Sequence, residues 1–122
     1  MAFIKSTSVV TDTAITVPNL TGGTNGRVVR INGTNSVANA ANTDSTVQLN
    51  SVLIKQNDTY YASGVVSGFS SLSPGSPYFL ASDGTLTSTP PVPTASVRVL
   101  YVGFALNTTD LLFRPGTPIS GT

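Results

Sequence analysis

Short runs of β-branched and aromatic residues, separated by turn-forming dipeptides, constrain the fold of this chain more than any other feature of its sequence. No segment keeps apolar residues at the 3.6-residue period of a helix for three turns. Runs with strand propensity recur instead, and turn formers follow them. The sequence therefore predicts an all-β chain with its main strands at residues 27–32, 51–56, 59–67, 77–81, 85–88, 97–106 and 110–114.

The dipeptides between these runs favour tight turns. Glycine accepts a positive φ, asparagine and aspartate tolerate one, and proline fixes φ near −65°. Asp83-Gly84 lies between two strand-forming runs and predicts a two-residue hairpin turn of type I′. Strands at this spacing predict a compact antiparallel β-sandwich or barrel. The other turn dipeptides are Asn32-Gly33, Asn57-Asp58, Pro74-Gly75 and Asn107-Thr108.

The chain divides into three parts. Residues 1–26 read as an extended N-terminal arm and hinge, because Val, Ile and Thr recur from Ser8 to Val17 and the glycine-rich stretch TGGTNG then predicts a flexible joint. Residues 27–116 form the β module, and residues 117–122 form an extended C-terminal tail. Within the module, residues 97–106 are apolar on both faces, which predicts a strand inside the fold or, as the alternative, one covered by a second subunit.

The composition argues against enzyme chemistry. The chain has no histidine, cysteine or glutamate, and five aspartates are its only acidic side chains. The usual general bases, thiol nucleophiles and soft metal ligands are therefore missing, and the sequence predicts no enzyme activity, no cofactor and no metal site. The six basic residues are spread singly, so no nucleic-acid partner is expected.

Low charge favours assembly. Only 9% of the residues are charged and the formal net charge is +1, so copies repel one another weakly. The sequence therefore predicts a chain that assembles into a homo-oligomer. The first ten residues contain no apolar stretch of secretory length, and the most apolar segment, residues 97–106, is too short to cross a membrane. Neither secretion by a signal peptide nor a membrane partner is expected.

Two segments, GVVSGFSSLSPGSPYFLASDGTLTSTPP and VRVLYVGFALNTTDLLFRPG, carry a family resemblance. In their order and spacing they resemble a β module of tailed-phage virion proteins, found in head decoration (capsid cement) proteins and in head or tail fibres. The likeness covers about residues 27–116. The matching residues are Gly68, Leu72, Pro74, Gly75, Pro77, Tyr78, Phe79, Leu80, Gly84, Leu86, Thr87, Pro90, Pro91, Val102, Gly103, Ala105, Leu106, Leu111 and Leu112.

The resemblance implies a virion structural protein without catalysis. The short chain lacks a fibre shaft, which favours a capsid decoration protein. Such a protein is made in the host cytoplasm, binds the outer surface of the phage head and stabilises contacts between major capsid subunits. It is expected to act as a homo-oligomer, with a trimer favoured and a dimer as the alternative. The alternative is a tail-fibre, receptor-binding or carbohydrate-binding module. Tyr60 and Tyr61 do not provide a sugar platform together, because neighbouring residues of one strand point to opposite faces.

The arm supplies the predicted contact residues. An extended segment can add to an exposed sheet edge of the capsid protein or of a sister subunit and place its apolar side chains in shallow pockets. The residues expected to make this contact are Phe3, Ile4, Val9, Val10, Ile15 and Val17.

Overall fold

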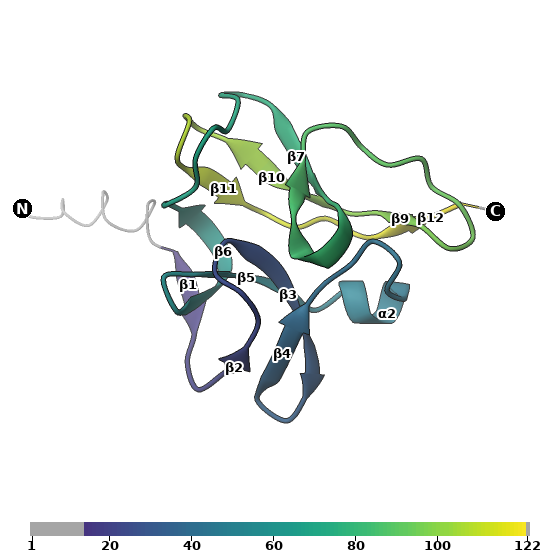
Figure 1. The fold of residues 1–122 in the computed structure, drawn as a ribbon, viewed down its shortest axis with the longest axis horizontal. Helices are drawn as coiled ribbons and strands as arrows, with labels where there is room; N and C mark the ends of the chain where they lie inside the picture. The colour runs from purple at the N-terminus through teal and green to yellow at the C-terminus, as the bar shows by residue number, and fades with distance from the viewer. Residues whose placement is uncertain (1–13, 122) are drawn as a thin grey trace, which may run out of the picture.

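The computed structural model describes residues 14–121, and these residues confirm the predicted all-β fold. They form one ten-stranded sheet and a separate two-stranded sheet (Figure 1). The strands are β1 (Ile15–Val17), β2 (Thr21–Gly22), β3 (Arg27–Gly33), β4 (Ser36–Asn39), β5 (Val52–Gln56), β6 (Thr59–Val66), β7 (Pro77–Leu80), β8 (Leu86–Thr87), β9 (Arg98–Val99), β10 (Tyr101–Ala105), β11 (Leu111–Phe113) and β12 (Ile119–Ser120).

The large sheet runs in the order β2-β4-β3-β5-β6-β11-β10-β7-β8, with β1 paired to β6 as an additional strand. Every pair is antiparallel except β2 with β4, which is parallel. The predicted antiparallel architecture therefore holds for all of the main strands.

Strand β6 joins two layers of the sheet. Its first half pairs with β5 and β1, and its second half, from Gly64 onward, pairs with β11. Gly64 has a φ of 104°, and a Cβ at this position would lie 2.6 Å from the Cα of Ala14. A glycine is required here because the strand bends and another backbone approaches it closely. We call β1 to β5 with the first half of β6 the first layer, and the rest of the sheet the second layer (Figure 1).

The main core lies between the two layers. Val28 and Ile54 of the first layer and Leu80, Val102 and Phe113 of the second layer are all almost fully buried in one cluster. Side chains of these strands alternate between the core and the other face of the sheet, as the period of two requires.

A short helix, α2 (Thr46–Leu49), closes one end of this core. Ser45 caps the helix: its side chain accepts from the N–H of Gln48, and the Gln48 side chain accepts from the N–H of Ser45. This reciprocal pair is a capping box, which stabilises the first turn. Leu49 is fully buried and anchors the helix on the core. The sequence analysis predicted no helix here.

A second, smaller core lies on the opposite face of the first layer. Val29, Val37 and Tyr60 are buried there, and Leu20 packs against them. Tyr61, the neighbour of Tyr60, packs against the main core instead. The prediction that the two tyrosines point to opposite faces is therefore confirmed. The first layer is covered on both faces.

The strand predicted at 97–106 is divided in two. Leu100, fully buried, separates β9 from β10. β10 lies between β11 and β7, but only one of its faces is buried in the main core: Val102 and Ala105 belong to that core, whereas Tyr101 and Phe104 are partly exposed. β9 leaves the large sheet and pairs with β12, so residues 119–120 of the predicted extended tail are docked on their own chain.

The described part of the predicted arm and hinge is folded. β1 pairs with β6 of the same chain, and β2 pairs with β4. The TGGTNG stretch, expected to be a flexible joint, is held by side chains: the Tyr60 hydroxyl donates to the carbonyl of Gly22 at 2.8 Å, and Nζ of Lys55 donates to the carbonyls of Gly22 and Gly23 at 3.1 and 3.2 Å. The predicted boundary at residue 26 thus falls within the folded module.

Candidate interaction surfaces

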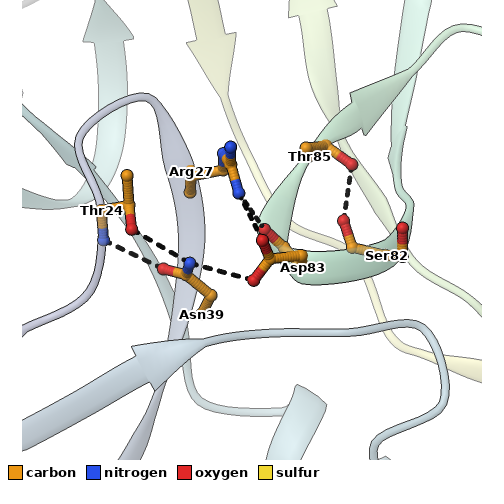
Figure 2. A network of polar contacts seen from close by, with 6 residues as sticks. All are labelled: Thr24, Arg27, Asn39, Ser82, Asp83 and Thr85. Carbon is orange, nitrogen blue, oxygen red and sulfur yellow. Dashed lines mark hydrogen bonds and ion pairs between the residues drawn. The ribbon is translucent and has the colours of Figure 1, made fainter.

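Asp83, in the connection between β7 and β8, organises a polar network that joins the two layers (Figure 2). Nη1 of Arg27 donates to its carboxylate at 2.7 Å and to its carbonyl at 2.9 Å. Nδ2 of Asn39 donates to the other carboxylate oxygen at 3.1 Å, and the N–H of Thr24 donates to Oδ1 of Asn39 at 3.0 Å. The network ties the end of the second layer to β3 and β4 of the first.

The connection also packs closely on β3. Gly84 has a φ of 74°, and a Cβ at this position would lie 2.5 Å from the carbonyl oxygen of Val28. The N–H of Asn42 adds a hydrogen bond of 3.3 Å to the carbonyl of Ala81. The two ends of the sheet therefore meet through side chains and a close backbone approach. The polar groups of this network form hydrogen bonds with one another within the chain, so the network stabilises the fold.

Asp44 and Asp110 are similarly engaged. Nε of Arg30 donates to Asp44 at 2.9 Å, and the same carboxylate accepts the N–H of Ala41 at 2.8 Å. Asp110 accepts hydrogen bonds from Nδ2 of Asn107 and the hydroxyl of Thr109. Within residues 14–121, no three acidic, histidine or cysteine side chains gather into a metal-binding group.

Hydrogen bonds lower the pKa of two of these carboxyls. The amide of Asn39 and then the guanidinium of Arg27 hold the pKa of Asp83 below its ordinary value of 3.8. The Asn107 amide, Ser67 and Thr109 do the same for the pKa of Asp110. Since the folded state lowers each pKa, the carboxylates stabilise the fold above pH 3.8, and this contribution is lost as the pH falls through the folded pKa values.

The pH dependence of the melting temperature tests this assignment. We expect no change between about pH 5.5 and 7, because the chain has no histidine to titrate there, and a fall below about pH 4 as the carboxylates become protonated. The Asp83→Asn variant should melt lower at pH 7 and show a smaller further decrease between pH 5 and 3. Calorimetry at a series of pH values measures both. If the melting temperature of the variant fell between pH 5 and 3 as steeply as that of the wild type, Asp83 would not contribute to the loss of stability in acid.

Two hollows lie beside the described end of the arm. One is an apolar groove of about 260 Å³, and the other is a hollow of about 220 Å³ with a more polar lining. Val17 and Leu20 line both of them. The apolar groove is completed by Ile31, Ser51, Val52 and Leu53.

The structure separates the predicted contact residues. Val17 is half-buried and lines the two hollows, whereas Ile15 is 60% exposed at the edge of the sheet. Phe3, Ile4, Val9 and Val10 lie outside the described residues. β1 pairs with a strand of its own chain along one edge, so only its other edge can receive a strand from a partner.

The second layer presents a further apolar surface. It includes side chains of residues 97–106, the segment for which cover by a second subunit was the alternative expectation. We call the side facing away from the main core the outer face. Its side chains are at least partly exposed and belong to neither core cluster. In register across the strands, Val65 lies opposite Leu112, Leu112 opposite Phe104, and Phe104 opposite Pro77. A second row contains Phe79 and Tyr101, whose rings meet edge to face at 6.0 Å.

Comparisons of the chain with protein-family models, with curated proteins and with solved structures found no match. Among the described residues, no helix has the length and apolar character needed to span a bilayer.

Proposed function

We propose that this chain is a structural protein of a tailed-phage virion, a capsid decoration protein that binds the outer surface of the head as a homo-oligomer and stabilises contacts between major capsid subunits. The resemblance of residues 27–116 to the virion β module carries this proposal. Its matched residues fall largely in one part of the molecule: Pro77, Tyr78, Phe79 and Leu80 form β7, and Leu111 and Leu112 belong to β11. The motif therefore corresponds to the second layer, which presents the apolar outer face.

The mechanism requires adhesion without chemistry. Among residues 14–121, β1 pairs with β6 alone. Its other edge, here called the open edge, lies beside the exposed side chain of Ile15 and can accept a strand of a shell subunit through backbone hydrogen bonds. A strand of three residues gives a weak single contact. An oligomer that engages several shell subunits gains about 10² to 10⁴ in avidity through effective concentration. Because the protein binds the assembled shell and not the free subunits, it stabilises the shell by mass action.

The open edge of β1 predicts the effect of one substitution. Ile15→Asp should weaken binding to undecorated phage heads about tenfold or more, because a charged side chain replaces an apolar contact at the edge that receives the partner. Ile119→Asp is the matched control: Ile119 is 59% exposed, close to the 60% of Ile15, but lies on β12 in the small sheet. Co-sedimentation of each variant with heads measures the affinity.

Two results would count against the proposal. Equal binding of the Ile15→Asp and Ile119→Asp variants would remove β1 from the contact. Electron cryo-microscopy of virions that places the protein at the tail, together with glycan binding on an array, would replace head decoration by the tail-fibre or receptor-binding alternative.

A further inference from the structure

The outer face of the second layer carries two opposite charges in a symmetric position. Asp110 precedes β11 and Arg114 follows it, with Leu112 midway between them. The N–H of Leu106 donates to the carbonyl of Asp110 at 2.9 Å and the N–H of Arg114 donates to the carbonyl of Val102 at 2.8 Å, so the pairing of β10 and β11 extends through both residues. The alternation of a strand then places Asp110, Leu112 and Arg114 on one face.

Both charges are available to a partner. Among residues 14–121, neither Asp110 nor Arg114 forms an ion pair. The guanidinium of Arg114 lies 5.6 Å from the centre of the Phe104 ring, over the apolar row. The hydrogen bonds from Asn107 and Thr109 hold the Asp110 carboxylate in place and favour its ionised form.

We propose that the outer face is the interface of a two-fold symmetric homodimer, in which the axis lies between the two copies at Leu112 and Arg114 of each copy meets Asp110 of the other. In a two-fold interface the same patch contacts itself, so it must be self-complementary. An axis perpendicular to β11 and parallel to the sheet reverses the strand direction and brings position 114 of one copy over position 110 of its partner. The apolar rows then pack against each other around Leu112.

The distances fit this arrangement. Two residues of strand place each charge about 7 Å from Leu112 along β11, and two sheets packed face to face are about 10 Å apart, a gap that a long arginine and a short aspartate span together. Packed sheets cross at about 30°, which displaces the two charges sideways by about 3 to 4 Å. The flexible arginine side chain absorbs this displacement. Each dimer therefore contains two intermolecular ion pairs at the rim of an apolar centre.

The two charges also favour a second copy of this chain as the partner that binds the outer face. With one anion and one cation about its centre, the face has no net charge to attract a nucleic acid or a strongly acidic or basic partner, whereas a second copy satisfies both charges. The other candidate is the chain's own segment 1–13, because Ala14 lies against Gly64 at the margin of the face. This dimer is the homo-oligomer of the proposed function, and its role on the phage head rests on that proposal. Its formation in solution can be tested without any phage head.

Sedimentation velocity of the full chain over a range of concentrations tests the dimer. We expect a species of twice the 12.5 kDa mass of the chain. Leu112→Asp should raise the dimer dissociation constant about 100-fold or more, because it places charges at the centre of the apolar contact. Val47→Asp is the control: Val47 is 77% exposed on α2, which packs against β3 of the first layer, and this variant should remain dimeric.

A mixing experiment tests the symmetry. Arg114→Glu and Asp110→Lys should each weaken the homodimer about tenfold or more, because like charges then meet twice across the axis. In an equimolar mixture, the new carboxylate at position 114 faces the new ammonium at position 110, and the unchanged Arg114 and Asp110 face each other. The mixture should therefore form a heterodimer near wild-type affinity, which sedimentation or native mass spectrometry detects.

Three outcomes would overturn the dimer. A trimeric wild type, the oligomer favoured in the sequence analysis, would be incompatible with a two-fold pair. A mixture of the two charge variants that stays monomeric would reject the axis at Leu112. A monomeric wild type whose melting temperature falls when residues 1–13 are deleted would assign the outer face to the chain's own N-terminal segment. The binding of the protein to phage heads is measured separately, so a failed dimer leaves head decoration open to its own test.

Discussion

Replacing Gly103 with alanine is expected to destabilise the protein by about 3 kcal/mol or more, a large part of the 5 to 15 kcal/mol that holds a domain folded. Gly103 lies in β10 and pairs with both β7 and β11. A Cβ at this position would lie 2.0 Å from the carbonyl oxygen of Leu112 and 3.2 Å from the Cα of Phe113. These are backbone atoms of a central strand, so they cannot move aside as the end of a flexible side chain can.

Gly75→Ala separates this clash from backbone strain. Gly75 has a φ of 81°, but a Cβ there would meet no atom within 4 Å. Its replacement should cost only about 1 kcal/mol, the usual effect of forcing a residue with a side chain into positive φ. Urea unfolding monitored by circular dichroism gives both free energies. If the two variants lost equal stability, the close approach of Leu112 to Gly103 would be wrong.

The contrast between these glycines shows what the sequence can and cannot supply. Gly75 lies in a Pro-Gly pair, a recognised turn signal, and its role follows from neighbouring residues alone. Gly103 lies inside a run of apolar residues and fits the sequence pattern of an ordinary strand. Its requirement comes from Leu112, a residue of the next strand, and from the irregular register between β10 and β7. Such a requirement is visible only once the strands are paired.

Turn chemistry was the most predictable part of the fold: the turn expected at Asn57-Asp58 is confirmed, whereas the two-residue hairpin expected at Asp83-Gly84 is wrong. Asn57 and Asp58 have φ of 52° and 60° and connect the paired residues Gln56 and Thr59, which is the geometry of a two-residue hairpin. Asp83 also has a positive φ, 54°, but the nearest pair is Leu80 with Leu86, so the predicted two-residue loop is longer. The main strands were predictable because each is a β-branched or aromatic run of its own.

The short elements were not predictable, because tertiary contacts decide them. β4 contains Ser36 and Asn39, which have low strand propensity, and it forms through pairing with β3. The Ser-x-x-Gln signal of α2 was present at residues 45–48, but four helical residues show no period of 3.6. In the arm, the alternating Val, Ile and Thr predicted a strand, but the sequence did not show which strand it pairs with. The structure shows that its partner is β6 of the same chain.

The candidate contact residues divide in the same way. Ile15 is exposed on a strand and its contact with a partner stays a prediction, whereas Val17 faces hollows formed by its own chain. The outer face had a signal in the sequence, since residues 97–106 are apolar on both faces. Choosing which of those side chains point outward required the irregular register around Gly103. The sequence therefore indicated that residues 97–106 have an additional apolar face, but only the structure showed which side chains form it.

Deleting residues 1–23 is expected to cost about 3 kcal/mol or more relative to a chain that lacks residues 1–13. The difference between the two variants is the segment 14–23, which contains β1, β2 and Leu20. This segment covers the smaller core: Leu20 packs on Val29, Val37 and Tyr60, and a Cβ on Gly23 would lie 2.6 Å from Cγ1 of Val29. Its removal exposes apolar side chains that are now almost completely buried.

The lost hydrogen bonds add to the lost burial. The Tyr60 hydroxyl and Nζ of Lys55 lose the carbonyls of residues 22 and 23, and β6 loses one of its two partners in the first layer. Leu20→Ala in the full chain isolates the side-chain part and should cost about 1 to 2 kcal/mol, since Leu20 is only partly buried. Thermal unfolding of the three variants measures these differences. If the two deletion variants melted at the same temperature, residues 14–23 would be an independent arm, as the sequence alone suggests, and the shell could recruit the whole of β1 as an added strand instead of only its outer edge.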